Sequence, residues 1–248
     1  MIYLLTSLAL LLSAASALAA AWGKAPLARL LFRAGWLVAL ALFVANAMLA
    51  QAMPFGNMRH VLCFFPLVLL PAAAWVHHRT GANLTSHFAA AAAIALLGAL
   101  CMPLQAAWRQ MPALQSPWFA PHVTAYVLAY GLMAVATVPA LRATSAHPQR
   151  MQVADAIVRL ALPCMTFGLW SGALWADAAW GRYWAWDIKE TWALLTWLIY
   201  VAYLHLPATT ACFPYRKALL LLGFVAIIIT FLVVNFLPAT GSLHTYSM

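Results

Sequence analysis

Apolar residues in this chain gather into long runs, and the polar residues fall in short breaks between them. A helix needs about twenty residues to cross roughly 30 Å of hydrocarbon, and eight runs approach that length. Transmembrane strands would alternate polar and apolar residues in segments of about ten, and this alternation is missing. The pattern predicts an all-α, polytopic transmembrane helical bundle with eight spans, of which the third and seventh are the shortest. We expect them at residues 2–21, 29–50, 60–76, 84–102, 121–141, 156–176, 190–207 and 217–236.

Composition narrows the picture to one membrane-embedded body. Hydrophobic residues make up 67% of the 248 positions and charged residues 7%, and the mean hydropathy is +0.90. Between the runs, no polar stretch is long enough to build a soluble domain with its own core. We therefore expect a single integral-membrane domain over residues 1–248.

The distribution of basic residues predicts the orientation. The first run ends in Ala17-Leu18-Ala19, which resembles a signal-peptidase site, but its positive charges follow the run instead of preceding it. We expect an uncleaved first helix with its N-terminus outside, so eight spans place both termini on the outer side. Nine basic residues then lie on or beside the inner connections and four on the outer side, as the positive-inside bias requires. The formal charge of +9 is thus explained by topology and does not indicate nucleic-acid binding.

Residues 170–190, here called the Trp-rich segment, depart from the rest of the chain. They hold three of the four carboxylates and five of the twelve tryptophans. An interfacial aromatic belt is one explanation, although a belt is usually spread over many helix ends. The density fits a flat apolar shelf for a large planar ligand such as haem, whose propionates Arg182 or Lys189 would pair. Arg182 and Lys189 would otherwise snorkel to the headgroups.

Asp187 and Glu190 have a structural explanation of their own. Their spacing is that of an N-cap residue and the third residue of the helix it caps. We expect a capping box that opens the seventh helix and sets the exit of the loop, and no acid–base role.

The predicted spans place the histidines at different depths in the membrane. His122 begins the fifth span and His244 follows the eighth, so both are expected on the outer face with the Trp-rich segment. Two neutral imidazoles on opposite sides of a macrocycle can hold haem iron, although a lone histidine at a helix end is more often an interfacial polar residue. His205 lies fifteen residues after Glu190, about 22 Å along a helix, so it belongs to an inner site or to none. His87 could approach it from the same side.

The four cysteines are widely spaced, with no Cys-x-x-Cys pair. This spacing argues against a zinc site and against thiol–disulfide exchange. We interpret them as buried small side chains.

Residues 172–197, which include Trp180-Gly181-Arg182-Tyr183-Trp184-Ala185-Trp186-Asp187, closely resemble the WWD domain of the CcsA (ResC) cytochrome c biogenesis family. The resemblance continues at Tyr203-Leu204-His205, at Ser116-Pro117-Trp118-Phe119-Ala120-Pro121-His122 and at Gly241-Ser242-Leu243-His244-Thr245-Tyr246. It covers most of residues 116–246, the CcsA-like haem-handling region. The first hundred residues match weakly: Arg59-His60 stands where the family pattern has Tyr-Glu.

The resemblance implies a haem-handling subunit of system II. Such proteins act with a ResB-like (CcsB) membrane partner, carry haem b across the inner (cytoplasmic) membrane and present it at an outward WWD loop. There the Cys-x-x-Cys-His segment of an apocytochrome c forms thioethers with the haem vinyl groups. No side chain of the chain need be catalytic, so it would be one component of a haem lyase. By match, His122 and His244 are the outer iron ligands and His205 is an inner one. The expected porphyrin-binding residues are Trp175, Trp180, Arg182, Tyr183, Trp184, Trp186, Asp187 and Trp192.

Two other functions remain open. The chain could be a haem transporter or chaperone that delivers haem without ligation. It could also be a regulatory membrane subunit like the HemX relatives that share the fold. A relative that binds no haem would not need His122 and His244 together with an intact loop.

Overall fold

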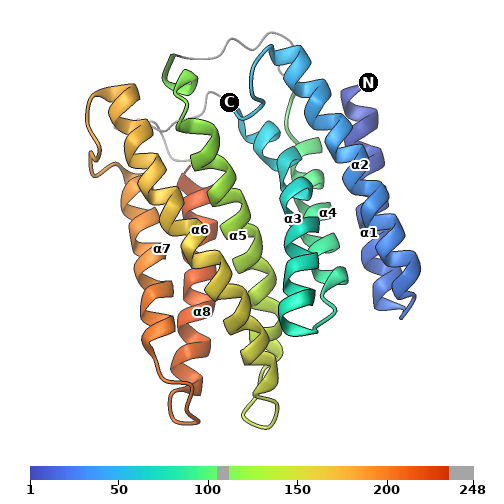
Figure 1. The fold of residues 1–248 in the computed structure, drawn as a ribbon, viewed down its shortest axis with the longest axis vertical. Coiled ribbons are helices and arrows are strands. Elements are labelled where there is room, and N and C mark those ends of the chain that lie inside the picture. Colours follow the sequence, from blue (N-terminus) through green and yellow to red (C-terminus); the bar gives the residue numbers. More distant parts are fainter. Residues whose placement is uncertain (105–111, 235–248) are drawn as a thin grey trace. The chain divides into compact units, whose positions relative to one another are not determined.

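The computed structural model describes residues 1–104 and 112–234, and within these ranges the chain is all-α. The chain divides into two compact units, residues 1–115 and 116–248. Eight α-helices carry the fold, four in each unit (Figure 1). Their bounds are α1 Ile2–Ala21, α2 Ala25–Ala50, α3 Met58–Thr80, α4 Thr85–Leu100, α5 Phe119–Arg142, α6 Gln149–Trp180, α7 Ile188–His205 and α8 Phe213–Ile228.

The eight predicted helices are confirmed. The prediction that all eight cross the membrane is confirmed in part. Six of the helices in the described residues are long and apolar enough to cross a membrane: α1, α2, α3, α5, α6 and α8 with its extension to Val233. Apolar α4 has only 16 residues, about 24 Å of helix. α7 is not among the six; its first turn holds Lys189 and Glu190, and it also carries Thr191 and Thr196. The third span was predicted too short, since α3 has 23 residues and continues through Pro66 and Pro71.

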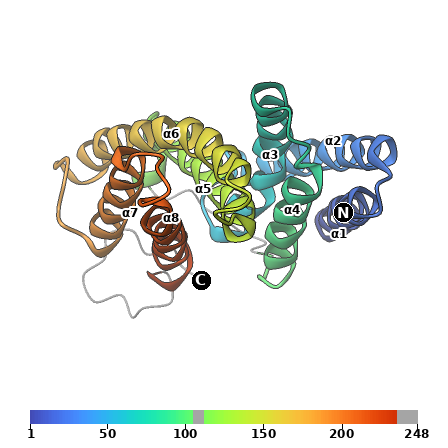
Figure 2. The same ribbon diagram turned by 90° about the horizontal axis from the view of Figure 1, so that it is seen from below.

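In the first unit, α1 packs against α2 and α4, and α3 packs against α4 and α2 (Figure 2). Small residues allow the close approach of α1 and α2. Ser16 donates a hydrogen bond of 2.7 Å from Oγ to the carbonyl oxygen of Ala28, and Ala9 and Ser13 are buried. Hydroxyl-to-backbone bonds between closely packed small residues are a common way to join helices in membranes.

In the second unit, α5 packs along α6, and α8 packs against α7 and α5 (Figure 2). A short π-helical segment, Ile229–Val233, extends α8. The core between these helices is rich in large rings, and Tyr200 and Tyr203 of α7 are fully buried. The loop between α6 and α7 and the connection between α7 and α8 lie at opposite ends of this unit (Figure 1).

Candidate functional site

The Trp-rich segment is half helix and half loop. α6 continues to Trp180, and Gly181 ends it in the left-handed conformation with a φ of 71°. The Gly181 N–H donates to the carbonyl oxygen of Asp177 at 2.8 Å, which closes the last turn. The loop proper is therefore residues 181–187, shorter than the 170–190 expected, because α6 continues four residues beyond the predicted span, to Trp180.

The predicted capping box is confirmed at the start of α7. The Asp187 carboxylate accepts a hydrogen bond of 2.7 Å from the Lys189 N–H, as an N-cap does. The Glu190 carboxylate reaches back and accepts from the N–H groups of Asp187 at 3.1 Å and Ala185 at 2.8 Å. Both acids are buried, so these bonds hold the second half of the loop at a fixed angle to α7.

Within the loop, the aromatic side chains differ in exposure. Trp186 is 71% exposed and has a φ of 56°, a conformation rare for a bulky residue. Tyr183 is also exposed, and the rings of Trp184 and Trp186 meet edge to face at 5.9 Å between centroids. The Trp184 indole N–H is buried without a hydrogen-bond partner in the structure. The loop thus carries exposed rings and one buried donor that remains to be satisfied.

Beneath the loop, Trp175 joins the aromatic groups to His122. Its ring is only 5% exposed and lies 4.9 Å from Trp180 and 5.2 Å from Phe119, centroid to centroid. The imidazole of His122 stacks on it at 5.5 Å, with an interplanar angle of 28°. Trp175 supports the site from below, whereas Tyr183 and Trp186 lie on its exposed side.

The imidazole of His122 is oriented by main-chain atoms of α6. Its Nδ1 lies 2.8 Å from the carbonyl oxygen of Gly168. A carbonyl only accepts, so Nδ1 carries the proton in this bond. In the neutral ring, Nε2 then carries the lone pair, which is the arrangement of a metal-ligating histidine held by a backbone carbonyl.

Gly172 provides the space for that imidazole. A Cβ atom at this position would lie 2.5 Å from Nδ1 and 2.6 Å from Cε1 of His122. Sequence reasoning missed Gly168 and Gly172 as site residues. The signal was two small residues one helical turn apart on α6, and nothing local in the sequence ties that turn to His122.

The remaining predicted residues lie apart from this cluster or outside the described ranges. Arg182 is exposed on the loop, and Trp192 lies half-buried one turn into α7. His205, at the far end of α7, is exposed, and its Nδ1 bonds to the Val201 carbonyl of its own helix at 2.8 Å. His244 lies outside the described residues, as does the Gly241–Tyr246 motif.

In residues 1–104 and 112–234, no three His, Cys, Asp or Glu side chains are grouped so that they could hold a metal ion. His87 is on α4 in the first unit, whereas His205 is in the second, so their predicted proximity stays a prediction.

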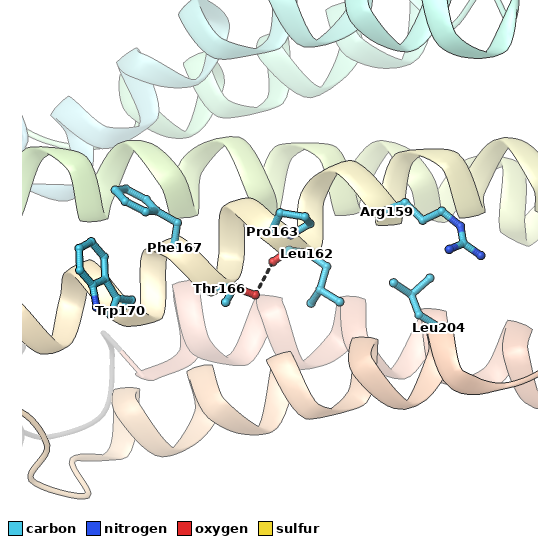
Figure 3. Close-up of a pocket in the computed structure, with 7 residues that line it drawn as sticks. All are labelled: Arg159, Leu162, Pro163, Thr166, Phe167, Trp170 and Leu204. Carbon is cyan, nitrogen blue, oxygen red and sulfur yellow. Dashed lines mark hydrogen bonds between the residues drawn. The ribbon is translucent and has the colours of Figure 1, made fainter.

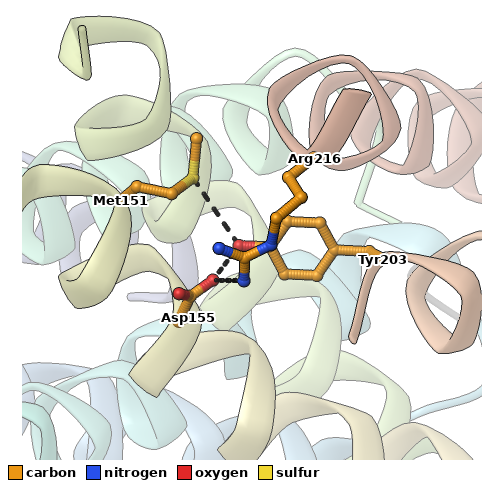
Figure 4. A network of polar contacts seen from close by, with 4 residues as sticks. All are labelled: Met151, Asp155, Tyr203 and Arg216. Carbon is orange, nitrogen blue, oxygen red and sulfur yellow. Dashed lines mark hydrogen bonds and ion pairs between the residues drawn. The ribbon is translucent and has the colours of Figure 1, made fainter. Parts of the chain in front are cut away.

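At the end of the second unit opposite the loop, a polar cluster joins three helices (Figure 4). Arg216 of α8 donates from Nη2 to Oδ1 of Asp155 on α6 at 2.6 Å, and the hydroxyl of Tyr203 on α7 donates to the same oxygen. The guanidinium of Arg216 lies 5.1 Å from the Tyr203 ring centroid. Sequence reasoning did not identify this cluster, because Tyr203 and Arg216 lie 48 and 61 residues after Asp155.

The fold and the site together define a multi-helix membrane protein with a histidine beneath a tryptophan-rich, capped loop. Residues 4–241 match the family described as cytochrome c assembly protein. The chain belongs to this family.

Curated proteins similar to this chain are cytochrome c biogenesis proteins, in agreement with the family match. The chain is 30% identical to the cytochrome c biogenesis protein CcsA of Guillardia theta over 231 residues, which are 78% of this chain and 76% of that protein. It is 44% identical to CcsA of a Nostoc species over 117 residues, or 44% of this chain and 33% of the relative. Over 91 residues it is 50% identical to CcsA of Porphyra purpurea, covering 36% and 28% of the two chains. Identity is thus higher over shorter matches, and two of these three relatives are spanned to a third of their length or less.

Proposed function

We propose that this chain is the haem-handling and haem-presenting membrane subunit of a system II cytochrome c synthase. It would lie in the inner membrane with loop 181–187 facing the periplasm or its equivalent. The observation that carries the proposal is the imidazole of His122, which is stacked on Trp175 beneath the loop with Nδ1 bonded to a backbone carbonyl. That bond prepares Nε2 to ligate iron.

The residues present fit haem b as the cargo. The exposed rings of Tyr183 and Trp186 offer apolar faces to a porphyrin, and Arg182 offers a cation to a propionate. The buried indole N–H of Trp184, which has no partner in the structure, is a donor that a propionate would satisfy. His244 would supply the second outer ligand, and His205, with Nδ1 likewise bonded to a carbonyl, an inner one.

The chemistry requires no nucleophile from this chain. Each thiol of an apocytochrome c Cys-x-x-Cys-His segment adds across a haem vinyl group: sulfur bonds to one vinyl carbon, the thiol proton passes to the other, and the double bond becomes single. Haem supplies the vinyl groups and the iron. The side chains of this protein position and orient, which is the main contribution in such a reaction. A ResB-like membrane subunit and the apocytochrome would be the partners.

The first test is spectroscopic. We expect the purified protein to carry low-spin, bis-histidine haem, and replacement of both His122 and His244 by alanine to remove most of it. His147→Ala, a change in the exposed α5–α6 connection, is the control and should leave the spectrum as it was. A low-spin spectrum that the double replacement leaves unchanged would exclude the outer-site assignment.

A second test separates synthase from carrier. The chain is coexpressed with a ResB-like partner and a Cys-x-x-Cys-His acceptor in cells that lack other maturation systems. Covalent haem on the acceptor, lost when His122 is replaced, supports the synthase. If the protein binds haem but the acceptor stays unmodified, the haem transporter or chaperone is the correct function. A chain without haem in both tests would be a HemX-like regulatory subunit.

A further inference from the structure

A groove runs along one side of α6 in the second unit (Figure 3). Its volume is about 730 Å³. The apolar wall comes from Leu162, Pro163, Phe167 and Trp170 of α6 and from Leu204 of α7. Trp170 stands at one end and Arg159 at the other, eleven residues or about 16 Å apart along the helix (Figure 3). The groove is therefore long and apolar, with a single cation, Arg159, at one end.

Part of the wall is exposed and belongs to a helix suited to cross the membrane. Phe167 is 43% exposed and Trp170 is 54% exposed, and both lie on α6, which is long and apolar enough to cross a membrane. Thr166, which also lines the groove, uses its hydroxyl within the protein: it donates to the Leu162 carbonyl at 2.9 Å and accepts from the Trp197 indole at 2.9 Å. The wall thus offers mainly apolar contact to an occupant, with Arg159 and the indole N–H of Trp170 as its polar groups.

The charge of Arg159 has no counter-charge among the described residues. Its neighbour one turn earlier is Asp155, the usual partner at this spacing. The Asp155 carboxylate is engaged instead by Arg216 at 2.6 Å and by the Tyr203 hydroxyl, and the structure gives Arg159 no ion pair. Of the other three acids, Asp177 is about 27 Å farther along α6, and Asp187 and Glu190 follow the end of that helix. Among the described residues, Arg159 therefore remains available to pair with an anion from outside the chain.

We propose that this groove binds a phospholipid with an anionic headgroup, whose phosphate pairs with Arg159 and whose acyl chain lies along Leu162, Phe167 and Trp170. Charge complementarity selects the headgroup, and the exposed apolar wall on a membrane-spanning helix selects a lipid chain as the rest of the ligand. The lining includes Trp170, the first residue of the Trp-rich segment, but neither His122 nor any residue of loop 181–187, so the proposal does not depend on the proposed function.

The test compares lipids on the full chain in nanodiscs. One set contains phosphatidylcholine alone, and in the other part of it is replaced by phosphatidylglycerol; retained lipid is counted by native mass spectrometry after transfer to detergent. One cation near the headgroups corresponds to a preference of about fivefold for the anionic lipid. We expect that preference for the native chain, and most of it for Arg159→Lys, which keeps the charge.

Three variants make the test specific. Arg159→Gln should abolish the preference, whereas Arg29→Gln, which removes an exposed cation from the first unit, should not. Leu162→Trp fills the groove and should reduce retained lipid of both kinds while leaving Arg159 in place. Equal retention of the two lipids by the native chain, or a preference that persists in Arg159→Gln, overturns the proposal. Haem retained in the groove in place of lipid, and lost in Leu162→Trp, overturns it as well.

Discussion

His122 shows how much a single side chain depends on what faces it. Its imidazole is held between the Trp175 ring, the Gly168 carbonyl and the vacant position at Gly172. Two of these three restraints come from α6 main-chain geometry, which a histidine on α5 meets only after the helices pack. The direction of Nε2 is therefore a property of the α5–α6 pair.

Replacement of Gly172 by alanine should displace the imidazole, because the new Cβ would lie 2.5 Å from Nδ1. Overpacking of this kind typically costs about 1–3 kcal/mol in stability. We expect weaker haem binding and loss of low-spin character, measured by optical and electron paramagnetic resonance spectra. Gly98→Ala on α4, where the Cβ would meet only the end of Leu62 at 3.3 Å, serves as the control. An unaltered spectrum in Gly172→Ala would show that the imidazole is not held as described.

Lys189, beside the loop and just before the predicted seventh span, predicts a dependence on pH. Burial lowers the pKa of its ammonium group from 10.5 to about 8, and the Asp187 carboxylate limits the fall. Below pH 8, Lys189 is protonated in both the folded and the unfolded state, and burial of its charge destabilises the folded state. Between about pH 8 and 10.5 the unfolded state binds more protons, so stability should rise with pH. The free energy of unfolding should show this rise in the native chain and less of it in Lys189→Met; an identical pH profile would refute the assignment.

At the scale of elements, the second unit is joined differently at its two ends. Near the loop, the connection of α6 to α7 is short and capped. At the opposite end, Asp155, Tyr203 and Arg216 join three helices through polar contacts (Figure 4). Lys217 adds a contact to α5 by donating to the carbonyl oxygens of Leu141 and Ala143 at 2.9 and 3.0 Å. Both ends are thus fixed by hydrogen bonds, while rings pack between them.

The Asp155–Arg216 pair should behave as a coupled buried pair. Asp155→Leu leaves a guanidinium that is largely buried without its carboxylate, which typically costs about 3–5 kcal/mol. Asp155→Leu combined with Arg216→Met removes both charges and should cost much less than the sum of the single changes. The free energy of unfolding in bicelles, measured as a double-mutant cycle, checks this. Additive single effects would mean that the pair contributes no coupling.

Local patterns predicted elements well and contacts between them poorly. Apolar run lengths located all eight helices, and the spacing of Asp187 and Glu190 predicted the capping box. Trp175, which stays a predicted porphyrin-binding ring, is buried against His122, 53 positions earlier, and the sequence did not predict that contact. That contact depends on how α5 and α6 are aligned, and alignment is decided by packing along their whole length. The same holds for the cluster around Asp155.

At the scale of the whole molecule, the orientation in the membrane remains a prediction. Two single-cysteine variants test it in a background without the four native cysteines: Tyr183→Cys in loop 181–187 and Ala208→Cys in the exposed α7–α8 connection. In intact spheroplasts, a membrane-impermeant thiol reagent should label position 183, and it should label position 208 only after permeabilisation. The reverse pattern would place the loop inside and remove the basis for presenting haem outward.

The way His122 is held has a consequence for how such sites are found. Its acceptor is a main-chain carbonyl and its space is left by a glycine, so neither can be deleted by substituting alanine for a polar residue. A survey of polar positions by alanine scanning would detect the histidine and overlook what orients it. Scans that add volume at small residues, and sequence searches that pair each histidine with small residues one helical turn apart on another helix, would reveal sites of this construction.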